Sequence, residues 1–233
     1  MIKIENISTY GFETAIRGMR NPMNSWDKSD SAFGCNDYDN CYTCQHYDTG
    51  CNPVGGVYIG ENDLKLMRSL FKGGTEHRKY MRMINVTMDI TAPLYWWKEF
   101  DTYKVGTVAN SCSTMHKIHA KEFTLDDFSH EHLNSASTYV LKHTIKCLNE
   151  NRLAYKNYDE DVPFSNPKED LKSLWWQMIQ LLPSSYNQRR TVQINYEVAV
   201  NIIRQRKAHK LDEWHVMVHE LLNLPYMKEI MEG

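Results

Sequence analysis

Short polar side chains gather between Lys104 and Lys117, a stretch whose composition favours a loop. These residues carry amide, hydroxyl and imidazole groups: Asn110, Ser111, Ser113, Thr114 and His116. Such groups donate and accept hydrogen bonds, and Gly106 can act as a backbone pivot because glycine has few steric restrictions. We therefore predict that this loop presents hydrogen-bond donors to a phosphate or a base.

Four cysteines lie close together in the chain, at Cys35, Cys41, Cys44 and Cys51. Four thiolates in this spacing, including one C-x2-C pair, can surround a tetrahedral Zn²⁺ ion and stabilise a small loop. Redox-active or unligated thiols and an iron–sulfur cluster are the alternatives. We predict a Cys-rich insert at about residues 34–56 that holds zinc.

The segment from Arg17 to Asp30 is polar and rich in turn-forming residues. It is either an ordinary surface loop or a loop that folds over a ligand. In the second case Arg17 and Arg20 would offer paired donors to a phosphate or carboxylate.

Aromatic residues precede the polar loop, and they follow helical spacing from Leu94 to Phe100 after Pro93. Proline is tolerated in the first turn of a helix, so we predict a helix here that is buried on several faces. The run from Tyr80 to Val86 reads as a strand, and Ile2, Ile4 and Ile7 alternate with polar residues as in a half-buried strand.

Further helical patterns complete the scaffold. The first extends from Asn62 or Asp63, either of which could cap it, to Gly73-Gly74. The others run from Asp126 to Asn149, with Leu133, Tyr139, Val140, Ile145 and Leu148 among the expected buried positions, from Glu169 to Leu182, and through the block from Thr191 to Trp214, where Ile194, Val198 and Ile202 form one stripe.

Composition limits the class of protein. The chain has 233 residues and a formal net charge of −2 at pH 7. This charge gives no general case for binding to nucleic acid or to a membrane surface. The sequence shows no apolar run of about 18 residues, the length needed to span a membrane. We expect one domain covering residues 1–233, in a soluble, cytoplasmic protein.

The order of motifs resembles the flavin-dependent thymidylate synthases. Glu76-His77 is similar to that family's Glu-His pair, and the segment Ala92–Lys104 is similar to its motif helix without a gap. Leu182-Pro183, Asn195, Asn201, Arg206 and Glu213 follow the family's C-terminal pattern at similar spacing. The resemblance covers roughly residues 60–216.

This resemblance implies a fold and a site. The fold would be α/β (α+β), with a central, mostly antiparallel sheet flanked by long helices, and the chain would form a homotetramer with flavin sites between subunits. Glu76, His77, Lys104, Asn195 and Asn201 would contact FAD. Glu99, Asn110, Ser113 and Arg206 would bind a pyrimidine deoxynucleotide of the dUMP type, with Arg206 as the catalytic residue beside the base.

The chemistry of the family requires no protein nucleophile. Reduced flavin activates the uracil ring, with NADPH and methylenetetrahydrofolate as co-substrates, and the protein positions the cofactor and polarises the substrate. The resemblance therefore implies an enzyme that transfers a one-carbon unit to the base. The alternative is a nucleotide-binding protein that retains the fold and catalyses nothing.

Several positions depart from the family pattern. Thr102-Tyr103-Lys104 stands where the family has Arg-His-Arg, so that Lys104 keeps the positive charge of this motif. Glu99 replaces a substrate-binding glutamine, Cys112-Ser113-Thr114 replaces a phosphate-binding serine–arginine loop, and Ile179 and Glu197 replace arginines. Arg17, Arg20, Lys98, Arg189 or Arg190 could supply the missing charge.

Overall fold

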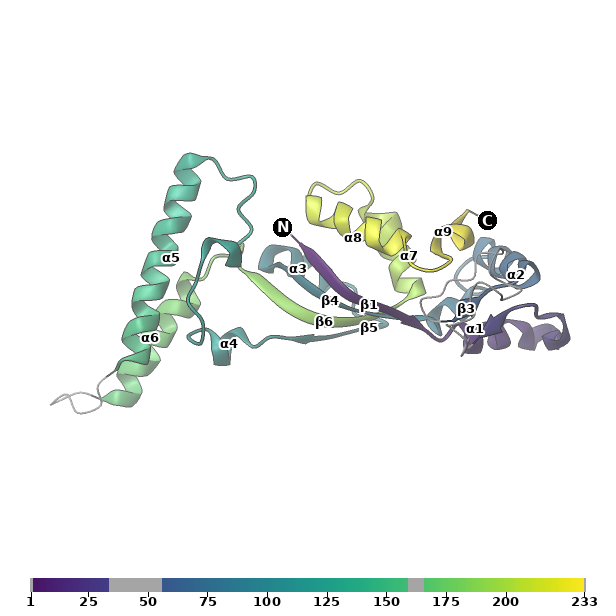
Figure 1. Ribbon diagram of the computed structural model, residues 1–233, viewed down its shortest axis with the longest axis horizontal. Coiled ribbons are helices and arrows are strands. Elements are labelled where there is room, and N and C mark those ends of the chain that lie inside the picture. The colour runs from purple at the N-terminus through teal and green to yellow at the C-terminus, as the bar shows by residue number, and fades with distance from the viewer. Residues whose placement is uncertain (1, 34–55, 159–165, 233) are drawn as a thin grey trace, which may run out of the picture. The chain divides into compact units, whose positions relative to one another are not determined.

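The computed structural model describes residues 2–33, 56–158 and 166–232, and these residues contain a four-stranded sheet and several helices (Figure 1). The sheet has the strand order β1-β4-β6-β5, formed by β1 (Lys3–Tyr10), β4 (Asn85–Pro93), β5 (Thr107–Ser111) and β6 (Asn187–Asn195). The short strands β2 (Ala32–Phe33) and β3 (Val57–Tyr58) pair antiparallel with each other in a second sheet.

Strands β4 and β6 run antiparallel. The Tyr196 amide donates to the Ile84 carbonyl beyond one end of the pair, and the Leu94 amide donates to the Tyr186 carbonyl beyond the other. Residue numbers rise along one strand as they fall along its neighbour, which defines an antiparallel ladder. The predicted fold class, α/β with a mostly antiparallel central sheet, is confirmed.

The described chain forms two compact units, each with its own packing. One unit comprises residues 2–3, 90–102 and 110–190, and the other comprises residues 4–89, 103–109 and 191–232, apart from the positions outside the described ranges. All four strands of the sheet, β1, β4, β5 and β6, contribute residues to both units.

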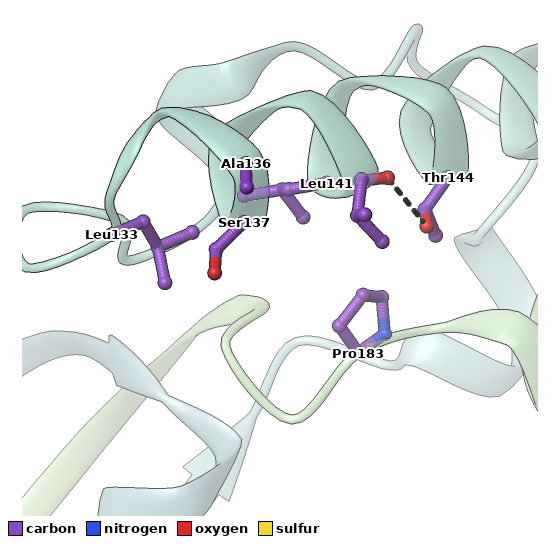
Figure 2. A pocket seen from close by; sticks show the side chains of 7 residues that line it. Leu133, Ala136, Ser137, Leu141, Thr144 and Pro183 are labelled. Carbon is purple, nitrogen blue, oxygen red and sulfur yellow. Dashed lines mark hydrogen bonds between the residues drawn. The ribbon is translucent and has the colours of Figure 1, made fainter.

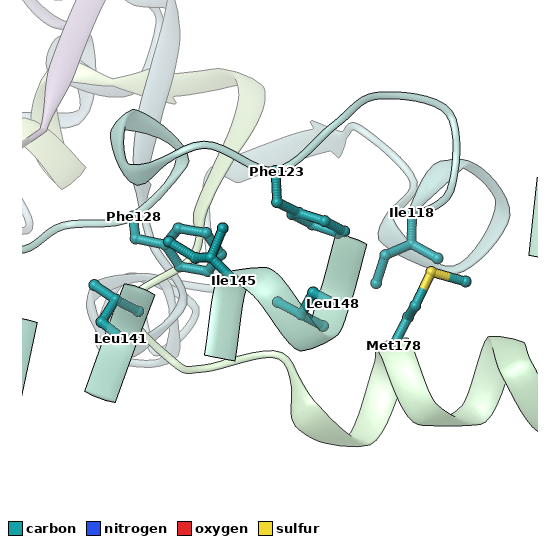
Figure 3. Close-up of a cluster of buried hydrophobic side chains, with 7 residues drawn as sticks. All are labelled: Ile118, Phe123, Phe128, Leu141, Ile145, Leu148 and Met178. Carbon is teal, nitrogen blue, oxygen red and sulfur yellow. The ribbon is translucent and has the colours of Figure 1, made fainter. Parts of the chain in front are cut away.

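The first unit contains α3 (Leu94–Phe100), α4 (Thr114–Lys117), the 3-10 turn η6 (Leu125–Asp127), α5 (Ser135–Lys156) and α6 (Pro167–Leu181). Helices α5 and α6 lie side by side (Figure 1). Figure 3 shows the buried cluster that this unit forms: Ile118, Phe123, Phe128, Leu141, Ile145, Leu148 and Met178.

The second unit contains α1 (Phe12–Arg20), the 3-10 turns η1 (Asn21–Met23), η2 (Trp26–Lys28) and η5 (Lys79–Arg82), α2 (Glu61–Lys72), α7 (Tyr196–Arg206), α8 (Asp212–Leu222) and α9 (Met227–Met231). Phe12 and Tyr196 meet edge to face, with their ring centroids 5.5 Å apart. The Tyr196 hydroxyl donates to the carbonyl of Pro225, which ties α7 to the chain after α8.

Several sequence-based boundaries were right. Helices α2, α3 and α6 match their predicted ranges within two residues, and the strand predicted at the start of the chain is β1. Gly106 has φ +78°, so it is the backbone pivot that we predicted. The predicted helix from Leu94 is buried on several faces, since Trp96, Trp97 and Phe100 are all buried.

Other boundaries were wrong. Tyr80 belongs to the 3-10 turn η5 and not to a strand, because the Met81 and Met83 amides close tight turns onto Arg78 and Tyr80. The predicted loop 104–117 contains β5 and α4, and the backbone amide of Cys112, directly after β5, donates to the carbonyl of Arg189 on β6. The segment predicted as a loop after Arg17 begins inside α1.

Helix α5 begins nine residues later than predicted, at Ser135, because Asn134 caps it by accepting a hydrogen bond from the Ser137 amide. The 3-10 turn η6, which precedes α5, has its own capping box, formed by Thr124 and Asp127. Leu141, Ile145 and Leu148 form the buried side of α5, which leaves three predicted core residues exposed: Leu133, Tyr139 and Val140.

The block predicted as a continuous helix from Thr191 changes type at Asn195. Ile194 lies on β6, and Asn195 caps α7 by accepting a hydrogen bond from the Val198 amide. An asparagine at the N-cap satisfies one of the amide groups that a helix start leaves without a partner. The strand and the helix therefore join without an intervening loop.

Arg20 and Asp63 form a buried ion pair that fastens the end of α1 to the start of α2. Their side chains are 5% and 0% exposed, and Arg20 Nε lies 2.6 Å from Asp63 Oδ1. Ser29 and Ser31 donate to the other carboxylate oxygen, both at 2.7 Å. Arg20 is thus a structural residue, which leaves less support for a loop that folds over a ligand here.

The predicted cap of α2 was wrong. Asp30, and not Asn62 or Asp63, caps this helix by accepting hydrogen bonds from the amides of residues 62 and 63.

Replacement of Asp63 by asparagine should lower stability at pH 7 by about 3–5 kcal/mol, because it leaves the buried Arg20 charge without its partner. Burial alone would raise the pKa of Asp63, but the hydrogen bonds from Ser29, Ser31 and Arg20 outweigh it, so that the pKa lies below its usual 3.8. A carboxyl group whose pKa is lowered by folding stabilises the protein at pH values above its pKa in the unfolded state. This stabilisation is lost as pH falls through the pKa of the folded state.

Urea unfolding of both proteins at pH 7 and at several pH values below 3.8 measures this contribution. The difference between wild type and Asp63→Asn should narrow as pH falls below 3.8. An equal difference at every pH would contradict the assigned role of the carboxylate.

Candidate functional site

The turn that carries Glu76 and His77 lines a cavity of about 410 Å³ in the second unit. Its walls come from the end of α1 with η1, from α2, and from the turn with η5. The lining residues include Met19, Met23, Leu66, Leu70, Glu76, His77, Lys79, Tyr80 and Met83. A cavity of this size, with apolar walls and a few polar groups, is typical of a small-molecule site.

Polar groups at this cavity differ in burial. Glu76, His77 and Lys79 are exposed, whereas Tyr80 is buried and donates its hydroxyl proton to the carbonyl of Met67. Burial raises the pKa of Tyr80, so its hydroxyl remains a hydrogen-bond donor near neutral pH. The side chains of Glu76, His77 and Lys79 are therefore the ionisable groups that a ligand in the cavity could reach.

A buried ion pair positions the Glu76-His77 turn. Arg78 donates from Nε and Nη2 to the two carboxylate oxygens of Glu197, at 2.8 and 2.9 Å. The two side chains are 5% and 10% exposed, and the Arg78 guanidinium also lies over the Phe71 ring, 5.3 Å from its centroid. Bidentate geometry of this kind fixes orientation as well as distance. The residue next to His77 is therefore locked to the first turn of α7.

The His77 ring is placed by close packing. A Cβ atom added at Gly73 would lie 3.1 Å from two atoms of the His77 ring, and the His77 amide donates to the carbonyl of Gly74. Glycine at position 73 thus lets the imidazole lie against the backbone at the end of α2.

Helix α7 and its N-cap residue carry three of the residues that the resemblance assigns to the site. Asn195 caps its start, where Gly106 approaches so closely that an added Cβ would lie 2.7 Å from Asn195 Nδ2. Asn201 lies half-buried along the helix, and Arg206 is its last residue. Arg206 lies nine positions after Glu197, about 14 Å along the axis at about 1.5 Å per residue.

Arg206 is held between aromatic side chains. Its Nε donates to the Tyr103 hydroxyl at 2.9 Å, and its guanidinium lies 4.6 Å from the centroid of the buried Trp214 ring. The Tyr103 hydroxyl in turn donates to Gln205 Oε1 at 3.0 Å. A guanidinium over an aromatic face is a favourable cation–π arrangement. Tyr103 and Arg206, which the sequence separates by a hundred residues, therefore meet in one cluster.

The remaining predicted substrate-binding residues belong to the first unit. Glu99 is half-buried on α3, and Asn110 is exposed on β5. The exposed Ser113 caps α4 by accepting from the His116 amide. The structure thus gives Ser113 a local structural role, and the predicted binding roles of these residues stay predictions.

Arg190 in the first unit is engaged by its neighbours. It donates to Asp101 Oδ1 at 2.7 Å and to Gln188 Oε1 at 3.0 Å, and its guanidinium lies 4.2 Å from the centroid of a Trp97 ring. Gln188 also donates to Thr114 and to the carbonyl of Cys112. Arg190, one of the residues that could have replaced the missing arginines, is therefore tied to the residue before Thr102.

The predicted zinc ligands Cys35, Cys41, Cys44 and Cys51 lie outside the described residues. Within residues 2–33, 56–158 and 166–232, no group of three or more His, Cys, Asp or Glu side chains could hold a metal ion. The same ranges contain no helix with both the length and the apolar character needed to cross a membrane.

Sequence reasoning missed the residues that hold the predicted ones in place. Arg78 follows Glu76-His77 directly, and Glu197 stands where the family has an arginine, but the sequence carries no signal for their ion pair because 119 residues separate them. The stacking of Trp214 on Arg206 had no signal either, because it depends on the turn between α7 and α8.

A second hollow lies in the first unit, where the start of α5 faces Pro183 (Figure 2). It is lined by Leu133, Ala136, Ser137, Val140, Leu141, Thr144 and Pro183. The Thr144 hydroxyl donates to the Val140 carbonyl within the helix. This hollow offers few polar groups to orient a ligand, so the cavity at Glu76 and His77 is the stronger candidate.

Replacement of Glu197 by glutamine should lower stability by about 3–5 kcal/mol, because it leaves the buried Arg78 charge without its partner. A double variant, Arg78→Met with Glu197→Met, should recover most of this loss, since an apolar pair of similar volume often replaces a buried ion pair at little cost. Urea denaturation of wild type, Arg78→Met, Glu197→Met, Glu197→Gln and the double variant measures the coupling. Additive effects of the two methionine substitutions would show that the pair contributes nothing beyond its separate residues.

Comparisons with known proteins agree with this fold. No protein-family model matches the chain, and no curated protein matches it in sequence. Among solved structures, thymidylate synthase X (ThyX) from Helicobacter pylori with FAD and dUMP is similar over 98% of this chain and 96% of its own, with a TM-score of 0.59 and 14% identity.

A second structure of that enzyme, also complexed with FAD and dUMP, gives a TM-score of 0.58 at 14% identity and covers 99% of this chain and 98% of its own. The UMP/dUMP methylase PolB from Streptomyces cacaoi, bound with 5-Br dUMP, covers 98% of this chain and 93% of its own at a TM-score of 0.56 and 9% identity. The chain therefore shares the fold of these nucleotide-methylating proteins.

Proposed function

We propose that this chain binds a pyrimidine deoxynucleotide of the dUMP type together with a flavin and transfers a one-carbon unit to the base. The observation that carries the proposal is the meeting of Tyr103, at the altered motif, with Arg206, at the end of the C-terminal pattern. In a fold shared over nearly the whole chain with proteins solved with dUMP, this contact brings together two segments to which the resemblance assigns ligand contacts.

Arg206 has the chemistry that the substrate requires. An arginine keeps its charge at any physiological pH and offers several donors in one plane. Placed beside the base, it would stabilise the negative charge that develops on the ring when C5 becomes a nucleophile. Trp214 and Tyr103 add flat aromatic surface next to the guanidinium.

The cavity at Glu76 and His77 fits the ring portion of a flavin. Its methionine and leucine side chains suit a flat ring, and His77, Glu76 and Lys79 suit the polar edge of that ring. Lys79 and the exposed Lys104 are the cations that we assign to the phosphates. A bound flavin would supply the redox chemistry, with NADPH as reductant and methylenetetrahydrofolate as carbon donor, while this chain orients the ligands and excludes water.

A second function is supported by a specific observation. Arg78 and Arg190 are paired with Glu197 and Asp101, so much of their charge is already neutralised inside the protein. Each charged hydrogen bond to a phosphate typically contributes about 1.5–3 kcal/mol, and a site that relies on lysines would hold a flavin less tightly. Nucleotide binding without catalysis is the corresponding alternative.

The absorbance spectrum of the protein separates the two functions. The purified chain is incubated with FAD and passed through a desalting column. Its absorbance is then recorded between about 350 and 500 nm, where flavins absorb. Retained flavin, together with release of the C5 proton from dUMP in the presence of NADPH and methylenetetrahydrofolate, is the expected result. A colourless protein that still binds dUMP in calorimetry would favour the alternative, and a protein that binds neither would refute both.

Arg206→Ala should reduce turnover by about 10²–10³-fold, the usual effect of removing one donor that stabilises developing negative charge. Arg204→Ala is the matched control, because Arg204 lies in the same last turn of α7, is exposed, and stacks on Phe71 away from the cluster. The control should retain turnover. Proton release from C5 of dUMP and thermal unfolding are measured for both variants. Equal turnover in Arg206→Ala and wild type would remove Arg206 from the reaction.

A further inference from the structure

We propose that Tyr103 is a positioning residue that sets the plane of the Arg206 guanidinium and thereby the affinity for the pyrimidine base. The inference rests on the proposed function, since it concerns the residue that we place beside the base. It concerns a position at which this chain departs from the family that it resembles: Tyr103 stands where that family has histidine.

The direction of each hydrogen bond follows from the chemistry of the three side chains. Arginine has donors and no acceptor, so the Tyr103 oxygen must accept from Arg206 Nε. The hydroxyl has one proton of its own, and the Gln205 carbonyl oxygen, 3.0 Å away, receives it. Tyr103 thus links two neighbouring residues of α7 through a single oxygen atom.

Aromatic packing fixes the same group from a second direction. Trp214 is 0% exposed, and the centroids of its ring and of Tyr103 lie 6.0 Å apart with an angle of 65° between the planes. The Arg206 guanidinium lies 4.6 Å from the Trp214 centroid and 5.6 Å from the Tyr103 centroid. Two rings and one hydrogen bond leave the guanidinium little freedom to rotate.

Restricting this side chain has a consequence for binding. A long arginine loses considerable rotamer freedom when a ligand orders it, and a group that is held in place beforehand avoids that loss at the moment of binding. The altered motif would thus act through Arg206 on the base.

The test uses the full chain and dUMP as the probe. Tyr103→Phe removes one oxygen atom, and Tyr139→Phe, at a residue 72% exposed on α5, removes the same atom where it should have no effect. The dissociation constant for dUMP is measured by calorimetry, and the exchange rate of the Arg206 Nε proton by NMR. We expect about tenfold weaker binding in Tyr103→Phe, equal to about 1.4 kcal/mol, and faster proton exchange.

Gln205→Leu provides a second variant in case Tyr103→Phe does not fold, because Gln205 is exposed and its loss withdraws only the acceptor of the tyrosine proton. It should weaken dUMP binding by about threefold, in the same direction as Tyr103→Phe. Thermal unfolding of each variant checks the fold.

The outcomes are distinguishable. Unchanged dUMP affinity in a folded Tyr103→Phe protein, when wild type binds dUMP, would overturn the inference and leave the proposed function standing. Faster proton exchange with unchanged affinity would give Tyr103 a purely structural role and also overturn it. A wild-type chain that binds no dUMP would overturn the proposed function and this inference together.

Discussion

The buried ion pair between Arg78 and Glu197 is the contact on which the second unit depends. It joins the turn after α2 to the first turn of α7, two segments separated by 119 residues in sequence. A carboxylate in the first turn of a helix also interacts favourably with the helix dipole. Because both charges are removed from water, either residue alone would be costly, and the two can be maintained only as a pair.

Helix α7 consequently has two distinct ends. Its start is fixed by the Asn195 cap and the ion pair, and its last residue, Arg206, is held by Tyr103 and Trp214. The first end orders the turn that lines the cavity at Glu76 and His77, and the second presents a guanidinium. A rigid helix of about 14 Å between them keeps the two groups at a constant separation. Rigid elements hold binding groups more precisely than loops do.

The substitutions that distinguish this chain from the family it resembles form contacts of their own. Glu197 pairs with Arg78, and Tyr103 bonds to Arg206. Asp101, directly before the altered motif, pairs with Arg190. Glu197 and Tyr103, two of the departures from the family pattern, thus have partners inside their own unit. The charges of Arg78 and Arg190 are used inside the protein, where they hold elements of their own units together.

The sequence by itself determined the elements with strong local signals. Helices α2 and α3 and strand β1 follow from periodicity and from the Gly73-Gly74 and Pro93 boundaries, and the order of motifs indicated the fold. Local patterns could not reveal that η5 interrupts the expected strand, that β5 lies within the polar loop, or that α5 begins only at Ser135. The position of β5 depends on a hydrogen bond from the Cys112 amide to the distant residue Arg189, whereas tight turns set η5 and the Asn134 cap sets the start of α5. The tertiary structure alone decided that Arg78 meets Glu197 and that Tyr103 meets Arg206, because such contacts form between segments that only the folded sheet and α7 bring together.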